Sequence, residues 1–258
     1  MIFPHRRLQQ SWKESGQMFD VHCHILPGLD DGAFSEDESL AMAEVAAENG
    51  TGFICCTPHS GEYTFDELLG TFRRLRNTVQ QNGIPVRLFL GQEIYITDNY
   101  RKQIKDIENG YPVTINRSVY PLVEFHPHVS ASTAFASVEM LVSAGFVPVI
   151  AHPERYFFVS DDTDNAKVLK KLGALLQINT GSLKGSFGIF AERAANYLLY
   201  KRMADFAASD AHSPFSRTPR LRGAHAYVSE QYSMDYADYI MRENPHRLVN
   251  NEKIYQYL

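Results

Sequence analysis

Cysteine is scarce in this sequence, and the three cysteines, Cys23, Cys55 and Cys56, form neither a Cys-x-x-Cys pair nor an even set. Such a set does not build a disulfide framework and is typical of a reducing compartment. The sequence also lacks a run of about 18 apolar residues, the length that spans a bilayer, and residues 1–17 lack the apolar run of a secretory signal. We therefore expect a cytoplasmic protein without disulfides or a transmembrane segment.

An excess of positive charge is missing as well. The chain has 25 Lys and Arg against 30 Asp and Glu, for a formal net charge of −5 at pH 7. Without a broad basic surface, nucleic acids and anionic membranes are not expected partners, although a local cationic site can still bind an anion. A content of 44% hydrophobic and 21% charged residues is that of a globular protein with a full core.

Short apolar runs alternate with helical periodicity from residue 18 onward, a pattern typical of β/α units around a parallel sheet. A chain of 258 residues fits one such domain. We assign the polar residues 1–17 to a flexible N-terminal extension and residues 18–258 to one α/β barrel domain. Seven strands are predicted, at 18–24, 52–57, 86–90, 119–125, 146–151, 174–179 and 204–208.

Helix boundaries are marked by capping and stop signals. Ser35 with Glu38, and Thr64 with Glu67, have the spacing of capping boxes that begin two helices. Glycine, often after asparagine, is typical of the position just beyond a helix. Such C-terminal stops are predicted at Asn49-Gly50, Asn82-Gly83, Gly145 and Gly173.

Histidines and carboxylates recur at the C-terminal ends of the predicted strands or in the loops just after them, where barrel enzymes build active sites. Residues i and i+2 of a strand point to the same face, so His22 and His24 can reach one ion. The sixth predicted strand, which ends at Asn179, offers no obvious ligand. The full set is His22, His24, Asp30, Asp31, His59, Glu93, Glu124, His152, Asp210 and His212.

Taken singly, each of these residues has an ordinary explanation, such as a polar loop histidine or, for Glu124, a helix cap or ion-pair partner. Taken together, buried unpaired charges would cost several kcal/mol each, and divalent ions would offset that cost. Imidazole and carboxylate donors without a thiolate suit Mn, Fe or Zn. We interpret the set as a metal centre and the cysteines as packing residues. His126 and His128, at its edge, could contact substrate or have no role.

Seven motifs together resemble the polymerase and histidinol phosphatase (PHP) superfamily, and within it the bacterial tyrosine-protein phosphatases encoded with capsule and exopolysaccharide genes. The resemblance covers about residues 18 to 250. The motifs are Asp20-Val-His-Cys-His24, Leu26-Pro-Gly-Leu-Asp-Asp-Gly32, Thr57-Pro-His59, Gly91-Gln-Glu-Ile94, Val123-Glu-Phe125, Ala151-His-Pro-Glu-Arg155 and Ser209-Asp-Ala-His212.

The resemblance implies a distorted (β/α)7 barrel of the PHP type that holds three metal ions, commonly manganese, with Fe or Zn as alternatives. Glu93 would bridge the first and second ions. The first ion would be bound by His22, His24, Glu93 and Asp210, the second by Glu93, Glu124 and His152, and the third by Asp31, His59 and His212.

The resemblance also implies the substrate and its contacts. Arg155 and Arg217 match phosphate-contacting arginines, although a surface ion pair with Glu154 would explain Arg155 equally well. The expected substrate is a phosphotyrosine protein, namely a bacterial tyrosine kinase that regulates polysaccharide synthesis. The expected reaction is hydrolysis by metal-activated hydroxide, since clustered ions lower the pKa of a bound water.

A cysteine-dependent phosphatase is excluded, because the residues six positions after the three cysteines are Leu29, Gly61 and Glu62 rather than arginine. A metal-dependent amidohydrolase would need a bridging lysine, and none is suitably placed. A small-molecule phosphatase, for example one acting on histidinol phosphate, and a catalytically silent metal-binding scaffold remain alternatives. The native metal and the oligomeric state, a homo-oligomer included, stay open.

Overall fold

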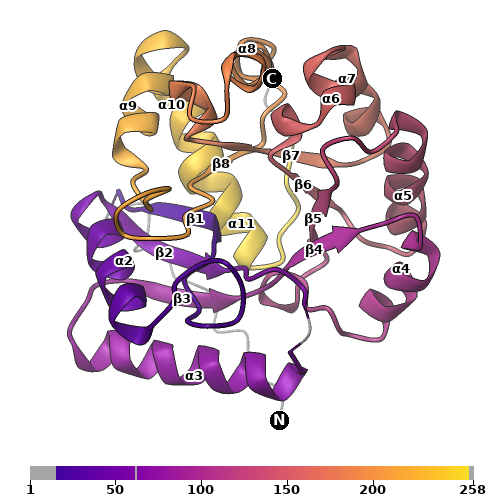
Figure 1. Cartoon of the computed structure of the whole chain (residues 1–258). Helices are drawn as coiled ribbons and strands as arrows, with labels where there is room; N and C mark the ends of the chain where they lie inside the picture. Colours follow the sequence, from indigo (N-terminus) through magenta and orange to yellow (C-terminus); the bar gives the residue numbers. More distant parts are fainter. Residues whose placement is uncertain (1–15, 62, 256–258) are drawn as a thin grey trace.

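The computed structural model describes residues 16–61 and 63–255, in which strands and helices alternate along the chain (Figure 1). The predicted N-terminal extension falls, except for Gly16 and Gln17, outside the described residues. One parallel sheet has the order β1 (Met18–Cys23), β2 (Thr51–Cys56) and β3 (Arg87–Leu90). The other, also parallel, has the order β4 (Glu93–Ile96), β5 (Leu122–Phe125), β6 (Val149–Ala151), β7 (Leu175–Asn179) and β8 (Phe206–Ala208).

The seven predicted strands are confirmed, but β4 was not predicted. Only Gly91 and Gln92 separate β3 from β4, and β3 pairs with β2 whereas β4 pairs with β5. The chain therefore passes from one sheet to the other at Gly91. A Cβ at this position would lie 3.1 Å from the Cα of Ile115, a tight contact that favours glycine here.

Further backbone hydrogen bonds connect the two sheets near their C-terminal ends. The Asp210 amide donates to the His22 carbonyl at 2.9 Å, and the His24 amide donates to the Ala211 carbonyl at 2.8 Å. An α/β single-domain fold is thus confirmed. Across the described residues, however, the strand ladders form two sheets and not one closed barrel.

Helices surround the sheets (Figure 1). Strands of both sheets contribute to one buried hydrophobic cluster that includes Phe19, Val21 and Phe206, together with Leu248 and Val249 of α11. The helices are α2 (Glu36–Glu48), α3 (Phe65–Gln81), α4 (Tyr100–Glu108), α5 (Ala131–Ser143), α6 (Phe157–Ser160), α7 (Asp164–Lys171), α8 (Ile189–Tyr200), α9 (Arg222–Gln231), α10 (Met234–Asp238) and α11 (Asn244–Val249). Short helical turns are η1 (Ile115–Arg117), η2 (Pro153–Arg155), η3 (Ser182–Lys184) and η4 (Tyr239–Glu243).

The predicted helix boundaries agree with the structure. Thr64 and Glu67 form a complete capping box at the start of α3. Ser35 accepts a hydrogen bond from the Glu38 amide, but the Glu38 carboxylate accepts from the Phe34 amide instead of closing the box. All four predicted stops are confirmed, since α2, α3, α5 and α7 end just before glycines with positive φ: Gly50, Gly83, Gly145 and Gly173.

Within residues 16–61 and 63–255, no helix combines the length and the apolar character that crossing a bilayer requires.

Candidate metal centre

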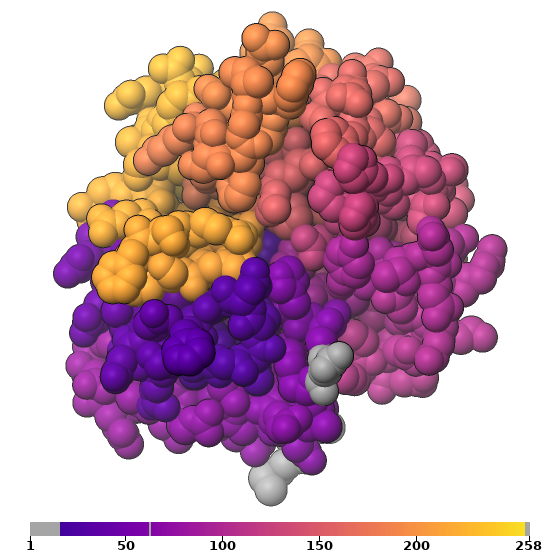
Figure 2. Space-filling model, viewed as in Figure 1, coloured from indigo at the N-terminus to yellow at the C-terminus, as the bar shows by residue number. Residues whose placement is uncertain are grey.

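The nine predicted ligands converge at the C-terminal ends of the strands. Their side chains form four overlapping groups, in each of which the potential ligand atoms lie within 4.8 Å of one another. These groups are His24, Asp31, His59 and His212; His22, Glu93 and His152; His22, His24 and Asp210; and His59, Glu93 and Glu124. In Figure 2 the loop that carries His212 lies, in orange, against the indigo loop that carries Asp31.

His22 of β1 and His24, just after this strand, point their Nε2 atoms at each other. The Nε2 atoms of His22 and His24 lie 3.1 Å apart. Oε2 of Glu93 lies 3.1 Å from the first and 3.2 Å from the second, and Oδ1 of Asp210 lies 3.5 Å from both. All four side chains are buried, so solvent does not separate these donor atoms.

Neighbouring residues determine which ring nitrogens carry hydrogen. The Gln177 amide nitrogen donates to Oδ1 of Asn179, so its oxygen accepts from Nδ1 of His22 at 2.8 Å. Asp30 accepts from Nδ1 of His24 at 2.7 Å. With Nδ1 protonated, each neutral imidazole directs the lone pair of its Nε2 at the other ring. Two lone pairs and two carboxylates therefore face one point, an arrangement that requires a cation or additional protons.

Protons are strongly held in this arrangement. Burial alone would lower the pKa of His24, but its hydrogen bonds with Asp30 and Glu93 raise the pKa to about 10. Burial would raise the pKa of Asp210, but the nearby imidazoles hold it well below its usual value. The pKa of His22 is also raised, because Glu93 and Asp210 outweigh the effect of burial. Imidazoles with raised pKa values thus face the carboxylates that a bound cation would also neutralise.

Glu93 directs its two oxygens toward different ligand groups. Oε2 faces the imidazoles of His22 and His24, whereas Oε1 lies 3.0 Å from Nε2 of His152. This His152 nitrogen in turn lies 3.6 Å from Oε1 of Glu124. Burial and the proximity of Glu93 raise the pKa of Glu124 to about 8. Nδ1 of His152 is buried and makes no hydrogen bond within the described residues. Glu93 therefore has the position of a bridging carboxylate between two groups.

The third set of ligands is more exposed. Oδ1 of Asp31 lies 3.5 Å from Nε2 of His59 and 3.4 Å from Nε2 of His212. Burial and the neighbouring His24 lower the pKa of His212 to about 4. Nδ1 of His59 lies 3.2 Å from Oε2 of Glu93 and 3.5 Å from Oε2 of Glu124, so this ring stands between the second and third groups instead of belonging to the third alone.

Both predicted arginines contact the metal centre through Asp210. Oδ2 of Asp210 accepts hydrogen bonds from Arg155 at 3.2 Å and from Arg217 at 2.7 Å. The alternative pair between Arg155 and Glu154 does not form in the described part of the chain. Glu154 is fully buried and accepts hydrogen bonds from the backbone N–H of Asn179 and from the Ser182 hydroxyl. Burial raises the pKa of Glu154 to about 7.

A half-buried aromatic ring supports both arginines. The guanidinium carbons of Arg155 and Arg217 lie 4.6 Å and 5.7 Å from the centroid of the Phe187 ring. These distances are within the range of a cation–π interaction. Phe187 lies in the loop between η3 and α8, and the sequence alone gave no signal for its role.

Sequence reasoning also missed the supporting residues of β7. Gln177 contacts His22, and the side-chain amide of Asn179 donates to Oδ2 of Asp210 at 2.6 Å. Two polar residues at i and i+2 in a buried apolar strand were the available signal. The strand that offers no ligand thus orients two residues of the metal centre.

The remaining predictions for this region concern histidines and cysteines. His126 and His128 are exposed and belong to none of the four groups, and the His128 ring lies 4.5 Å from that of Phe157. The three cysteines are free and buried, and burial raises the pKa of each thiol. Their interpretation as packing residues is confirmed.

Comparison with known proteins decides the family, because residues 18–250 match the family described as Capsular polysaccharide synthesis, CpsB/CapC. The chain belongs to the CpsB/CapC family. It is 32% identical over 246 residues to tyrosine-protein phosphatase YwqE of Bacillus subtilis, covering 93% of this chain and 94% of that protein. It is 27% identical to tyrosine-protein phosphatase CpsB of Streptococcus pneumoniae, covering 92% of this chain and all of that protein.

Solved structures agree with this family membership. A crystal structure from work on YwqE and CpsB, described as unique metal-dependent tyrosine phosphatases, has a TM-score of 0.86 and 30% identity, covering 93% of this chain and 97% of that one. A phosphotriesterase homology protein of Escherichia coli has a TM-score of 0.59 at 11% identity, which shows a shared fold alone. The resemblance inferred from the motifs is confirmed.

Proposed function

We propose that this protein is a metal-dependent protein-tyrosine phosphatase. The observation that carries the proposal is the convergence of the Nε2 lone pairs of His22 and His24 with the carboxylates of Glu93 and Asp210. The names of the relatives support the same activity. A cysteine nucleophile is excluded, because all three thiols are buried with raised pKa values.

The donor set fits three divalent ions, for which Mn2+ is our proposal. Shared use of Glu93 allows adjacent ions, and the second nitrogens of His22 and His24 are already held by Gln177 and Asp30, as metal-binding histidines generally require. When bound, such ions lower the pKa of water and neutralise phosphate charge. The ions would be held by His22, His24, Glu93 and Asp210; by Glu93, Glu124 and His152; and by Asp31, His59 and His212.

Arg155 and Arg217 would bind the phosphate. A guanidinium presents a planar pair of donors that matches phosphate oxygens, which the point charge of lysine cannot do. Both now donate to Oδ2 of Asp210, so phosphate would enter beside this carboxylate and share their remaining donors. A phenolate leaving group has a pKa of about 10 and needs less protonation on departure than a serine alkoxide.

The proposed substrate is a phosphotyrosine protein, namely a bacterial tyrosine kinase that regulates capsule or exopolysaccharide synthesis. The family description supports the polysaccharide context. This proposal places the reaction in the cytoplasm, which suits three free cysteines. We also propose that the two sheets of residues 18–258 correspond to a distorted seven-unit barrel, with residues 1–17 as an extension.

A substrate panel tests the activity. Phosphate release is measured with a phosphotyrosine peptide, the matched phosphoserine peptide and histidinol phosphate, each with added Mn2+. Release mainly from phosphotyrosine is expected. Preference for histidinol phosphate would assign the protein to small-molecule phosphatases, and absence of release from all three would favour a silent scaffold.

A further inference from the structure

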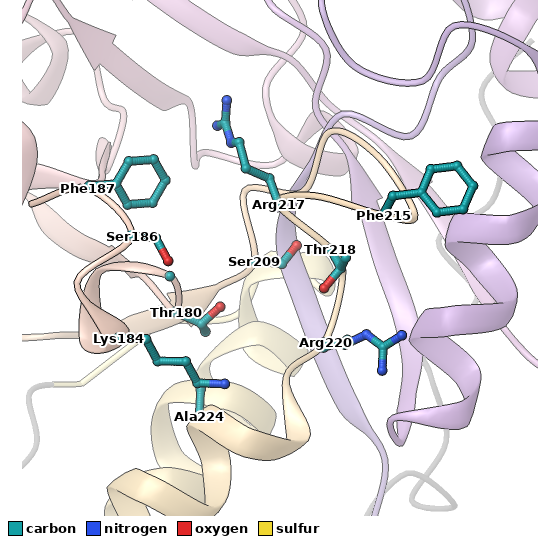
Figure 3. Close-up of a pocket in the computed structure, with 11 residues that line it drawn as sticks. Thr180, Lys184, Ser186, Phe187, Ser209, Phe215, Arg217, Thr218, Arg220 and Ala224 are labelled. Atoms are coloured by element: carbon teal, nitrogen blue, oxygen red, sulfur yellow. The ribbon is translucent and has the colours of Figure 1, made fainter.

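A pocket borders the candidate metal centre. It has a volume of about 280 Å3 and lies between the η3 region and the loop that leads into α9 (Figure 3). Arg217 belongs to both sites, since it lines this pocket and donates to Oδ2 of Asp210. Phe187, the ring beneath the two arginines, is a second shared wall. A peptide whose phosphotyrosine occupies the metal centre would therefore place a neighbouring residue in or near this pocket.

The lining of this pocket is cationic, although the chain as a whole is acidic. Its residues include Lys184, Arg217 and Arg220 but no carboxylate. Lys184 and Arg220 are exposed, and within the described residues neither side chain forms an ion pair or hydrogen bond. In Figure 3 they lie on two sides of the hollow, and the head of Arg220 extends away from Lys184. Long side chains of this kind can reorient toward an anion.

Neutral donors add to the cationic lining. The hydroxyls of Thr180, Ser186 and Thr218 line the pocket and have no side-chain hydrogen bond within the described residues. A hydroxyl can donate to a carboxylate or phosphate oxygen. Two cations without an ion pair among the described residues, a third that pairs with Asp210 and three available hydroxyls favour an anionic ligand over a neutral or cationic one.

We propose that this basic pocket binds an acidic group of the phosphoprotein substrate, a carboxylate or a second phosphate, that lies close to the phosphotyrosine in sequence. The inference rests on the proposed tyrosine phosphatase activity and specifies which phosphotyrosine sites the enzyme prefers. Lys184 and Arg220 are the specificity-determining residues. They act on the flanking residue of the peptide and not on the phosphate that is hydrolysed.

The test compares phosphotyrosine peptides that differ only at one flanking position, which carries Glu, Gln, Lys or a second phosphotyrosine. Values of kcat/KM are measured for the wild type, for the double variant Lys184→Met/Arg220→Met and for Lys184→Glu, with Mn2+ present. Lys102→Glu, an exposed lysine of α4, makes the same charge change elsewhere and is the matched control. Hydrolysis of p-nitrophenyl phosphate, which has no flanking residue, reports the basal activity.

The wild type is expected to prefer the Glu peptide over the Gln peptide by about five-fold at low salt, the size of effect that partly exposed charge pairs produce. The double variant loses this preference, Lys184→Glu shifts it toward the Lys peptide, and Lys102→Glu leaves it unchanged. Basal activity stays the same in all variants. Preference for the second phosphotyrosine instead of Glu would assign the pocket to phosphate and still support the proposal.

Two results would overturn it: hydrolysis of the Glu, Gln and doubly phosphorylated peptides at equal rates by the wild type, or a preference for an acidic flanking group that survives in the double variant. Binding of the same peptides to chelator-treated protein is measured by fluorescence anisotropy. This measurement tests the pocket without hydrolysis and so distinguishes failure of the pocket from failure of the proposed activity. A tighter Kd for the Glu or doubly phosphorylated peptide that disappears in the double variant supports the pocket even without hydrolysis. Equal Kd values for the Glu, Gln and doubly phosphorylated peptides would contradict the proposed binding of an acidic flanking group.

Discussion

The guanidinium carbon of Arg155 lies 4.6 Å from the centroid of the Phe187 ring, and the same arginine donates to Asp210. A cation–π contact and an ion pair thus hold the Arg155 head beside the metal centre. Arg217 uses the same ring and the same carboxylate oxygen. Phe187 therefore positions both arginines that the proposed reaction requires.

Replacement of Phe187 by leucine removes this support while keeping an apolar side chain. Since a cation–π contact contributes about 0.5–2 kcal/mol, we expect kcat/KM for a phosphotyrosine peptide to fall by roughly 2- to 30-fold. Phe190→Leu changes an exposed phenylalanine of α8 and is the control. Equal kinetics of the two variants would show that the ring does not position the arginines.

Gln177 determines which nitrogen of His22 is available to a metal. Gln177→Leu removes the acceptor of Nδ1, and we expect Mn2+ affinity to fall about 10- to 100-fold, the usual effect of losing such a partner. Calorimetric titration of the variant measures this change. Gln80→Leu, at an exposed position of α3, should bind like the wild type. Unchanged affinity in Gln177→Leu would contradict the tautomer assigned to His22.

Metal binding at His22 and His24 should depend on pH. The pKa of His24 in the ion-free protein is raised to about 10, so at lower pH this imidazole is protonated and must lose a proton to bind a cation. Affinity is therefore expected to rise with pH by about tenfold per unit for each proton released. Mn2+ titrations at pH 6.5, 7.5 and 8.5 measure the slope, and a pH-independent Kd would contradict the proton count.

A buried ion pair outside the metal centre affects stability alone. Lys170 binds Asp205 at 2.6 Å, and Asp205 also accepts from the Leu176 amide at 2.9 Å. Lys170→Met leaves a buried carboxylate unpaired and should lower the free energy of unfolding by about 3–5 kcal/mol.

Chemical denaturation measures this loss, and a second lysine of α7 provides the control. Lys167 pairs with Asp164 on the surface, so Lys167→Met should change the free energy of unfolding by less than about 1 kcal/mol. Similar losses in the two lysine variants would show that burial of Asp205 does not determine the effect.

Much of the fold could be predicted from the sequence because strands, helix caps and glycine stops are local signals. Thr64 and Glu67 close their box through residues three positions apart. The passage of the chain from one sheet to the other at Gly91 could not be predicted. It depends on the close approach to Ile115 and on the pairing of β3 with β2 and of β4 with β5. A single apolar run does not contain that information.

The candidate site likewise has a part that the sequence predicts, the ligands, and a part that it does not, the partners of those ligands. The ten candidate residues, Asp30 included, follow from their positions at strand ends, since parallel strands bring these ends together. The partners of those ligands were less visible: Gln177 and Asn179 resemble ordinary strand residues until the fold brings them to His22 and Asp210. Likewise, only the folded chain shows that Arg155 pairs with Asp210 while Glu154 turns into the interior.

The most direct test of the account is recovery of activity during metal reconstitution. Protein stripped with a chelator is titrated with Mn2+ while bound metal and phosphate release from a phosphotyrosine peptide are measured together. We expect no release from the stripped protein, full recovery when three ions are bound per chain, and no recovery in a folded Glu93→Gln variant. Release from the stripped protein at the rate of the untreated protein would contradict it.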